Sequence, residues 1–406
     1  MGITRHAGRW TLEDRFGSAW QYLPVEVPAG AYSLRAELEY ERSGAVLDLG
    51  CLGASGFRGW SGGARRSFTI TAREATPGYL PGELEPGLWH VIVGLHRLPV
   101  AGADYQVTIE VSSTPGALEP TPAPESMPAL PERPARRALP ATPGRMWLAG
   151  DLHTHTVHSD GVMTVSELAR FAAGRGMDFI AVTDHNTVSH HAELPAAAAA
   201  HGITLLPGQE VTREAGHANA FGDIGWIDFR EPPDSWLEAC EQSGGLLSVN
   251  HPYGGQVSWA APMKRRPPLL EVWHWSWLDT RWTTPFAWWL AWDPNAIPIG
   301  GSDWHQPGND APPGSPTTWV EAETADDPVA ILQALGAGRT ALSASRDGPV
   351  LLRVGDELVA SEGDGTILIG PDGPKARVRG PLAKFPAVDG WHRLVDASGA
   401  TLALVG

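Results

Sequence analysis

The chain has 406 residues, of which 42% are hydrophobic, so it is long enough for two or three domains with cores of their own. The formal net charge of −16 repels a phosphate backbone and argues against extensive nucleic-acid binding. Two cysteines, far apart in sequence, exclude a disulfide framework and a cysteine-rich zinc ribbon. The amino-terminal segment lacks the apolar stretch of a secretion signal, and no apolar run is long enough to span a bilayer. We therefore expect a soluble, cytoplasmic protein with no membrane or nucleic-acid partner.

Residues 1–112 contain runs in which apolar and polar side chains alternate, with glycine and proline turns between them. Several short strands of this kind predict an all-β sandwich. Residues 113–145 are rich in proline and have little hydrophobic pattern, which predicts a semi-rigid, extended linker. The alternating runs are YSLRAELEYE, VLDLGC, RRSFTIT, LWHVIVGL and YQVTIEV.

Residues 146–348 alternate between strand and helix patterns. Thr164 and Glu167 form a capping box that opens a helix, and Pro328 takes the first position of another. Strands that alternate with helices pair in parallel, and roughly seven such units favour a barrel over an open sheet. Residues 349–406 return to short β-like runs and predict a β-rich C-terminal extension. The strand runs are MWLAGDLH, DFIAVTDH, TLLPGQEVT, LLSVNHP, LLEVWHW, IPIGGSDWH and TTWVEAE.

The histidines are concentrated in one part of the chain, because 11 of the 15 lie between His153 and His305. Histidines and carboxylates follow the expected strands where each strand ends, and the carboxyl ends of parallel strands meet at one edge. Each such residue alone could be a helix cap or a solvated turn. Together they would repel one another or be desolvated without cations, so a metal cluster explains the set better. These residues are Asp151, His153, His155, Asp184, His185, Glu210, His251, Asp303 and His305.

The donor types indicate which metals suit the site. Imidazole nitrogens and carboxylate oxygens suit Zn, Mn or Fe, and the absence of cysteine ligands favours a catalytic site over a structural one. His153 and His155 lie two apart on an extended stretch and so project to the same side. The set exceeds what one ion can take, and we expect two to three divalent ions, with Glu210 able to bridge a pair. Weaker candidates are His190, His191, His201 and His274.

The ordered motifs DLHTHT with SDG, TDH, Glu210, NHP and GSDWH resemble the polymerase and histidinol phosphatase (PHP) superfamily over roughly residues 147–345. The resemblance implies a distorted (β/α)7 barrel with a trinuclear metal site, here preceded by the β-sandwich. HTVHSDG, AVTDHNT, GHANAFG, VNHP, GGSDWH and PTTWVEAE, with a β domain in front, are similar to the carbaryl-hydrolase-like branch of that superfamily.

The resemblance also implies ligand and supporting roles, residue by residue. His153, His155, Glu210 and Asp303 would hold the first ion, Glu210 would bridge to a second ion held by His217 and His251, and Asp160, His185 and His305 would hold the third. His153, His155, Glu210, Asp303 and His305 are then also the expected catalytic residues. Asp151 and Asp184 are expected to orient ligand histidines. His158 fits no ligand role and is a candidate for a supporting or substrate contact.

We expect a metal-dependent hydrolase in which a metal-bridging hydroxide is the nucleophile, because no serine or cysteine nucleophile is evident. The superfamily at large implies a phosphoesterase acting on a phosphomonoester or phosphodiester of a small molecule. The closer branch implies an aryl carbamate or a carboxyl ester instead. Tryptophans crowded between residues 273 and 292 could stack an aromatic leaving group, although core packing is the simpler interpretation for most of them.

Two further interpretations belong to other classes of protein. A non-catalytic, metal-stabilised binding module would not need the complete ligand set that the motifs supply. A polymerase-type exonuclease is disfavoured by the charge of −16 and by the absence of basic patches.

Overall fold

A computed structural model describes the chain except for residues 116–117, 119–131 and 309–310, so part of the predicted linker lies outside the described residues. The chain forms two compact units. The first comprises Met1–Ala123 with the short segments Val157–Val162 and Asp184–His190, and the second comprises the rest.

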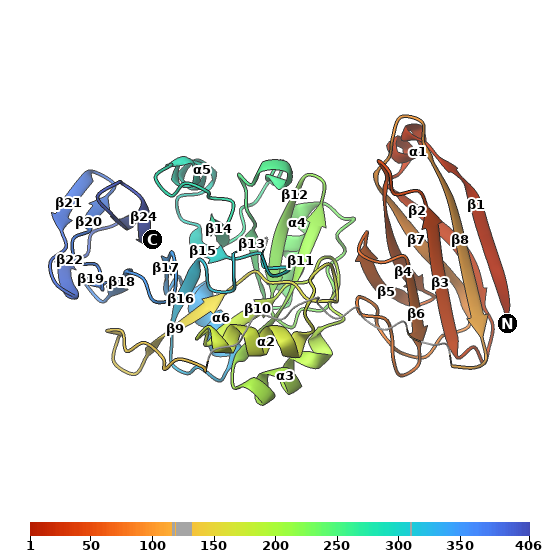
Figure 1. The fold of residues 1–406 in the computed structure, drawn as a ribbon, viewed down its shortest axis with the longest axis horizontal. Coiled ribbons are helices and arrows are strands. Elements are labelled where there is room, and N and C mark those ends of the chain that lie inside the picture. The colour runs from red at the N-terminus through yellow and green to blue at the C-terminus, as the bar shows by residue number, and fades with distance from the viewer. Residues whose placement is uncertain (116–117, 119–131, 309–310) are drawn as a thin grey trace. The chain divides into compact units, whose positions relative to one another are not determined.

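The amino-terminal part of the first unit is built from two four-stranded antiparallel sheets (Figure 1). One has the order β1 (Gly2–Trp10), β8 (Ala103–Ser112), β3 (Ser33–Tyr40) and β6 (Ser67–Thr71). The other has the order β2 (Trp20–Val27), β7 (Gly87–Arg97), β4 (Val46–Gly53) and β5 (Gly56–Gly62), and the helix α1 (Leu12–Gly17) joins β1 to β2.

Side chains from both sheets share one core, which includes Leu34, Leu49, Val91 and Ile109. The predicted β-rich amino-terminal domain is thereby confirmed. The sequence pattern missed three of its strands: β1 is mostly exposed, β2 carries a proline within its alternating run, and β5 is rich in glycine.

The second unit contains one large mixed sheet. Its first nine strands in chain order are β9 (Met146–Asp151), β10 (Phe179–Val182), β11 (Thr204–Arg213), β12 (Gly216–Phe221), β13 (Leu246–Val249), β14 (Leu269–His274), β15 (Ile297–Gly301), β16 (Thr317–Ala322) and β17 (Thr340–Ser343). Strands β9, β10 and β11 pair in parallel, as do β13, β14 and β15. Strand β12 is antiparallel to β11 and β13, and β16 is antiparallel to β9.

The predicted distorted (β/α)7 barrel is not confirmed. The sheet has the order β15-β14-β13-β12-β11-β10-β9-β16-β17, and within the described residues no strand pairing joins β15 back to the other end. Strand β12 runs antiparallel to β11 because the connection from Arg213 to Gly216 is short. It allows a hairpin, whereas a parallel strand would need a helical crossover. What the structure establishes is a β-rich unit and a mixed α/β unit.

Five α-helices of this unit pack on the sheet: α2 (Val165–Gly174) on β10, α3 (Leu194–His201) on β11, α4 (Pro233–Gln242) on β13, α5 (Thr284–Trp292) on β14 and α6 (Pro328–Gly336) on β16. The predicted capping box of Thr164 and Glu167 is formed, with both reciprocal hydrogen bonds present. Sheet and helix residues such as Phe179, Ile299 and Leu335 share one buried core.

The carboxyl-terminal residues are β-rich, as predicted. Strands β24 (Thr401–Val405), β23 (His392–Val395), β20 (Ile367–Gly370) and β21 (Gly373–Arg377) continue the large sheet from β17, while β18 (Val350–Val354), β19 (Glu357–Ser361) and β22 (Leu382–Pro386) form a separate sheet. The extension therefore shares the sheet of the second unit through the β17–β24 pairing.

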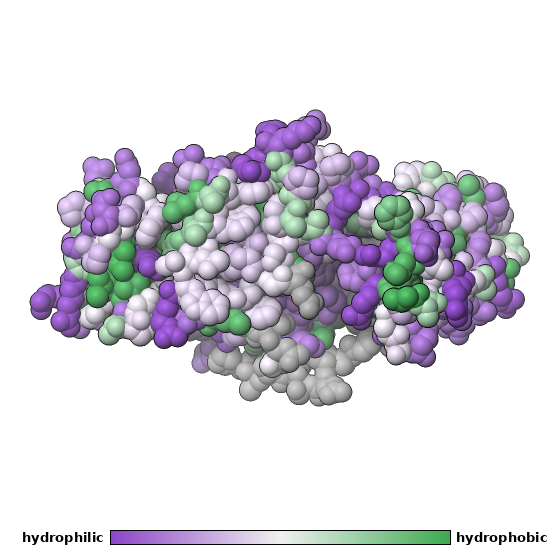
Figure 2. All heavy atoms as spheres, turned by 90° about the horizontal axis from the view of Figure 1, so that it is seen from above, coloured by the Kyte–Doolittle hydropathy of each residue, from purple (hydrophilic) through white to green (hydrophobic). Residues whose placement is uncertain are grey.

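The face shown in Figure 2 is mostly hydrophilic or neutral, with apolar groups in separate patches. Within the described residues, no helix combines the length and the apolar character needed to cross a membrane.

Candidate metal centre

The candidate ligands of the second unit lie at strand ends. His153 and His155 follow β9, Glu210 lies near the end of β11, His251 follows β13 and Asp303 follows β15. Backbone hydrogen bonds hold two of these segments together, because the Asp303 N–H donates to the His153 carbonyl at 2.9 Å and the His155 N–H donates to the Trp304 carbonyl at 3.0 Å. The sheet thus delivers donors from distant parts of the sequence to one place.

Four side chains form the first donor group: His153, His155, Glu210 and Asp303. The Nε2 atom of His153 lies 3.1 Å from Asp303 Oδ1 and 3.3 Å from Glu210 Oε1. The Nε2 atom of His155 lies 2.9 Å from Asp303 Oδ1 and 3.4 Å from Glu210 Oε2. A tetrahedral ion with ligand bonds of about 2.0–2.1 Å would separate its ligand atoms by about 3.3 Å. The spacing of the donors therefore fits one ion.

The hydrogen bonds of His153 show which of its nitrogens faces that position. Its Nδ1 atom lies 3.0 Å from Glu271 Oε1, an acceptor, so the ring proton belongs on Nδ1. The Nε2 lone pair then points toward two carboxylate oxygens, and Nε2 is a buried atom without a hydrogen-bond partner among the described residues. A buried lone pair facing two anionic oxygens is repulsive unless a cation lies between them, so the residues present fit a metal ion.

The pKa shifts report the same concentration of charge. Burial alone lowers the pKa of His153, but the facing carboxylates, Asp303 first among them, raise it well above its usual value. Burial alone raises the pKa of Asp303, but the surrounding histidines, His153 first, hold it well below its usual range. Without a metal, a proton would have to take the cation's place on His153.

Two of the candidate ligands adopt backbone conformations that non-glycine residues rarely adopt. His251 has a φ of +26° and Asp303 a φ of +52°. Such conformations cost about 1–3 kcal/mol each and are retained where the surroundings impose them, often at functional sites.

A second donor group surrounds Glu210 Oε1. His217 Nδ1 lies 3.1 Å from this oxygen, His251 Nε2 lies 3.3 Å from it, and the Asn250 side-chain amide donates to it at 3.0 Å. The β11–β12 register places Glu210 opposite Asn219, so His217, two residues away on β12, lies on the same face of the sheet. Glu210 thus lies between the predicted first and second ligand sets.

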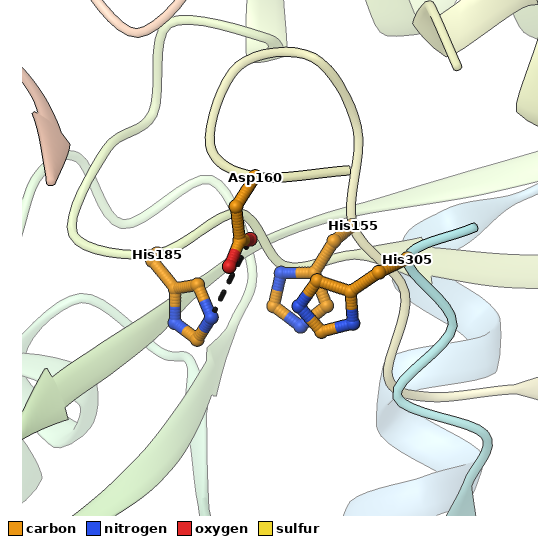
Figure 3. A group of neighbouring side chains, drawn as sticks. All are labelled: His155, Asp160, His185 and His305. Atoms are coloured by element: carbon orange, nitrogen blue, oxygen red, sulfur yellow. Dashed lines mark ion pairs between the residues drawn. The ribbon is translucent and has the colours of Figure 1, made fainter. Parts of the chain in front are cut away.

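The predicted third ligand set is distributed over both units. In the first unit, Asp160 Oδ1 lies 3.7 Å from His185 Nε2, and in the second unit the rings of His155 and His305 stack with centroids 4.1 Å apart. Figure 3 draws both pairs. Because the set joins residues of two units, its binding of one ion stays a prediction.

The predicted supporting residues have the following partners. Asp151 is buried and accepts the backbone N–H groups of His153 at 3.1 Å, Ser302 at 3.0 Å and Gly314 at 2.8 Å, so it holds the His153 backbone rather than the ring. Burial raises the pKa of Asp151. Asp184 accepts from Ser159 Oγ at 2.7 Å.

Two histidines of the first unit's short segments, His158 and His190, also have identified partners. His158 Nδ1 lies 2.7 Å from Ser189 Oγ, and the backbone N–H of Gly78 lies 3.4 Å from the same nitrogen. His190 Nδ1 lies 3.1 Å from an oxygen of Asp184. His158 is thus hydrogen bonded to the connection between β6 and β7 of its own unit.

Two residues of β14 belong to the neighbourhood of the site, and sequence reasoning gave them little weight. Glu271 was missed, although a glutamate inside the apolar run LLEVWHW is itself a signal, since buried carboxylates need partners. His274, a weaker candidate, places Nε2 3.3 Å from Asp303 Oδ2. The other weaker candidates bond elsewhere: His191 to the Gly208 carbonyl and His201 to Ser166.

Comparison with known proteins gives partial matches. A 3′,5′-nucleoside bisphosphate phosphatase from Chromobacterium violaceum is 45% identical over 109 residues, which cover 24% of this chain and 38% of that protein. A 5′-3′ exoribonuclease from Haemophilus influenzae is 39% identical over 62 residues, which cover 15% of this chain and 23% of that protein. The chain thus spans less than two fifths of the length of these two curated relatives.

Similarity to solved structures is remote. A two-domain protein from Bacteroides vulgatus that contains a predicted PHP-like metal-dependent phosphoesterase is 19% identical, with a TM-score of 0.43, over 68% of this chain and 99% of its own. An amidohydrolase from Chromobacterium violaceum, with bound sulfate and no metal, is 19% identical with a TM-score of 0.32, over 40% of this chain and 89% of its own. The family model described as the PHP domain matches residues 151–251, and this part of the chain is similar to that family.

Proposed function

We propose that the chain is a metal-dependent phosphoesterase that hydrolyses a phosphomonoester or phosphodiester of a small molecule. One observation carries the proposal: the buried Nε2 lone pair of His153 converges with oxygens of Glu210 and Asp303 at the spacing of an ion's ligands. The 45% identical segment of a nucleoside bisphosphate phosphatase supports a phosphoester as the substrate class.

The proposed ligand sets are those that the sequence predicts. His153, His155, Glu210 and Asp303 would hold one ion, Glu210 with His217 and His251 a second, and Asp160, His185 and His305 a third. The bound ions, Zn, Mn or Fe, would lower the pKa of water and polarise the phosphoryl oxygen. Of these ligands, we assign His153, His155, Glu210, Asp303 and His305 to the catalytic site.

The protein's own groups hold this arrangement before any substrate arrives. The Asn250 amide fixes one oxygen of Glu210 by a 3.0 Å hydrogen bond, and Asp151 fixes the backbone that carries His153. The side chains of His153, His155 and Glu210 are fully buried, whereas that of Asp303 is 16% exposed. We infer that substrate approaches from the side of Asp303.

A second candidate activity is hydrolysis of an aryl carbamate or carboxyl ester, as in the carbaryl-hydrolase-like branch. Of the seven tryptophans between residues 273 and 292, Trp273, Trp277 and Trp289 are buried. Trp275 is 40% exposed, and its ring lies 5.5 Å from that of His274, whose Nε2 contacts Asp303. The exposed ring of Trp275 lies beside a residue that contacts the candidate ligand Asp303, so it could stack a flat leaving group.

The test compares substrates side by side. The protein, purified with Mn or Zn, is assayed with p-nitrophenyl phosphate, bis-p-nitrophenyl phosphate, 1-naphthyl methylcarbamate and a short oligoribonucleotide. The proposal expects turnover of the phosphate esters, and turnover of the carbamate alone would refute it in favour of the second activity. His153→Ala and Glu210→Ala should lose bound metal in elemental analysis, while His201→Ala, on α3, should keep it.

A further inference from the structure

Strand β14 carries an irregularity beside the first donor group. Its pairing with β15 runs from Leu269 opposite Ile297 to Glu271 opposite Ile299, and then shifts so that Trp273 faces Gly300. In a regular strand, residues three apart point to opposite faces of the sheet. The extra residue of a bulge changes that alternation, and donor atoms of Glu271 and His274 both lie within 4.8 Å of one from His153.

Glu271 is held at both of its carboxylate oxygens. Its Oε1 atom lies 3.0 Å from His153 Nδ1, and its Oε2 atom accepts the backbone N–H of His251 at 2.7 Å. One buried carboxylate therefore fixes the ring of one candidate ligand and the strained backbone of another. A carboxylate can accept at both oxygens, whereas an amide has only one accepting atom.

His274 contacts Asp303, another member of the first donor group. The backbone N–H of Ser276 donates to His274 Nδ1 at 3.2 Å, so Nδ1 is the accepting nitrogen and the ring proton lies on Nε2. Nε2 lies 3.3 Å from Asp303 Oδ2 and donates to it. That oxygen is the one that does not face His153 and His155, which both approach Oδ1.

We propose that Glu271 and His274 are positioning residues of the first metal position, brought there by the β14 bulge. Glu271 keeps the proton of His153 on Nδ1, so that the Nε2 lone pair faces the ion. His274 holds Asp303 by its outer oxygen, so that Oδ1 stays turned toward the ion. The inference rests on the metal-binding half of the proposed function and is independent of the reaction catalysed.

A separate cation site made of His153, Glu271 and His274 is the competing explanation, since these three groups lie close together. The hydrogen bonds oppose it. Both oxygens of Glu271 already accept from protein N–H groups, and both nitrogens of His274 are engaged, one as acceptor and one as donor. An ion there would have to displace all of these bonds.

The experiment measures metal affinity by chelator competition, together with the visible spectrum of the cobalt-loaded protein. Glu271→Gln removes one accepting oxygen and is expected to weaken binding about 10- to 100-fold, the range typical of a lost supporting bond. His274→Leu removes the donor to Asp303 and is expected to act likewise. His274→Gln offers an amide N–H in place of Nε2–H and is expected to restore most of the affinity. Glu321→Gln and His392→Gln, buried residues of the same types outside the site, are the matched controls and should bind as wild type does.

The result that would overturn the proposal is wild-type affinity and an unchanged cobalt spectrum in both Glu271→Gln and His274→Leu. Equal weakening in His274→Leu and His274→Gln would also overturn it, because the hydrogen bond would then be irrelevant. If Glu271→Gln fails to fold, the two His274 variants still decide. A wild-type protein that binds metal but hydrolyses no phosphate ester would refute the proposed function and leave this inference standing.

Discussion

Gly301, the last residue of β15, offers a sharp test of the metal centre, because it lies directly against two of its side chains. A Cβ atom at this position would lie 2.4 Å from His153 Cβ and 2.6 Å from Glu271 Oε1. We therefore expect Gly301→Ala to displace His153 while adding only one methyl group and removing no donor.

The magnitude follows from these two distances. Carbon atoms pack at about 3.5–4.0 Å, so His153 has to move by roughly 1 Å to make room. Glu271 cannot yield easily, since both of its oxygens are hydrogen bonded. A misplacement of about 1 Å costs on the order of 100-fold in rate, and overpacking of a buried site costs about 1–3 kcal/mol of stability.

The assay combines metal content by elemental analysis, metal affinity, and kcat/KM on the phosphate ester that wild type turns over best. Gly17→Ala is the matched control, because a Cβ added there meets no atom within 4 Å. We expect Gly301→Ala to lose metal affinity and roughly two decades of kcat/KM, with Gly17→Ala unchanged. Gly301→Ala with affinity and kcat/KM within about twofold of wild type would refute the reasoning from the clash.

Three further outcomes are expected. Removal of the metal should lower the free energy of unfolding by about 2.7 kcal/mol, relative to protein at a metal concentration 100-fold above Kd. Thermal melts with and without added metal would check this, and identical melts would speak against a bound ion. Trp275→Ala should raise KM for 1-naphthyl phosphate more than for a short alkyl phosphate, and an equal effect on both would remove Trp275 from substrate binding. Burial raises the pKa of Cys51 and of Cys240 to about 12, so a thiol reagent at pH 8 should react with neither until the protein is unfolded, and rapid labelling of the native protein would contradict their burial.

Local signals in the sequence predicted much of what positions the site. The capping box at Thr164 defined the start of α2, and alternating or continuous apolar runs located most of the strands that carry the ligands. Strand ends then indicated which histidines and carboxylates could meet. His153, His155, Glu210 and Asp303 do lie together in the structure, although they are up to 150 residues apart (303 minus 153).

What the sequence did not predict depends on pairing between strands. Strand β12 was not among the predicted strands, and its antiparallel direction follows from a turn too short for a crossover. The bulge in β14 is equally hidden, because the run LLEVWHW does not show where its pairing with β15 shifts by one residue. Glu271 lies inside this strand, and its partners His153 and His251 follow other strands that only the pairing brings beside it.

The composition of the first unit limits how the chain can be divided. Its short segments Val157–Val162 and Asp184–His190 come from the first part of the strand-and-helix region, and Gly78, between β6 and β7, is hydrogen bonded to both through His158, Thr187 and Ser189. No single cut in the chain separates the two units. The amino-terminal sheets therefore cannot be removed or replaced independently of the rest of the chain. A truncation or domain swap at residues 113–145 would remove the partners of the two short segments, which carry Asp160 and His185.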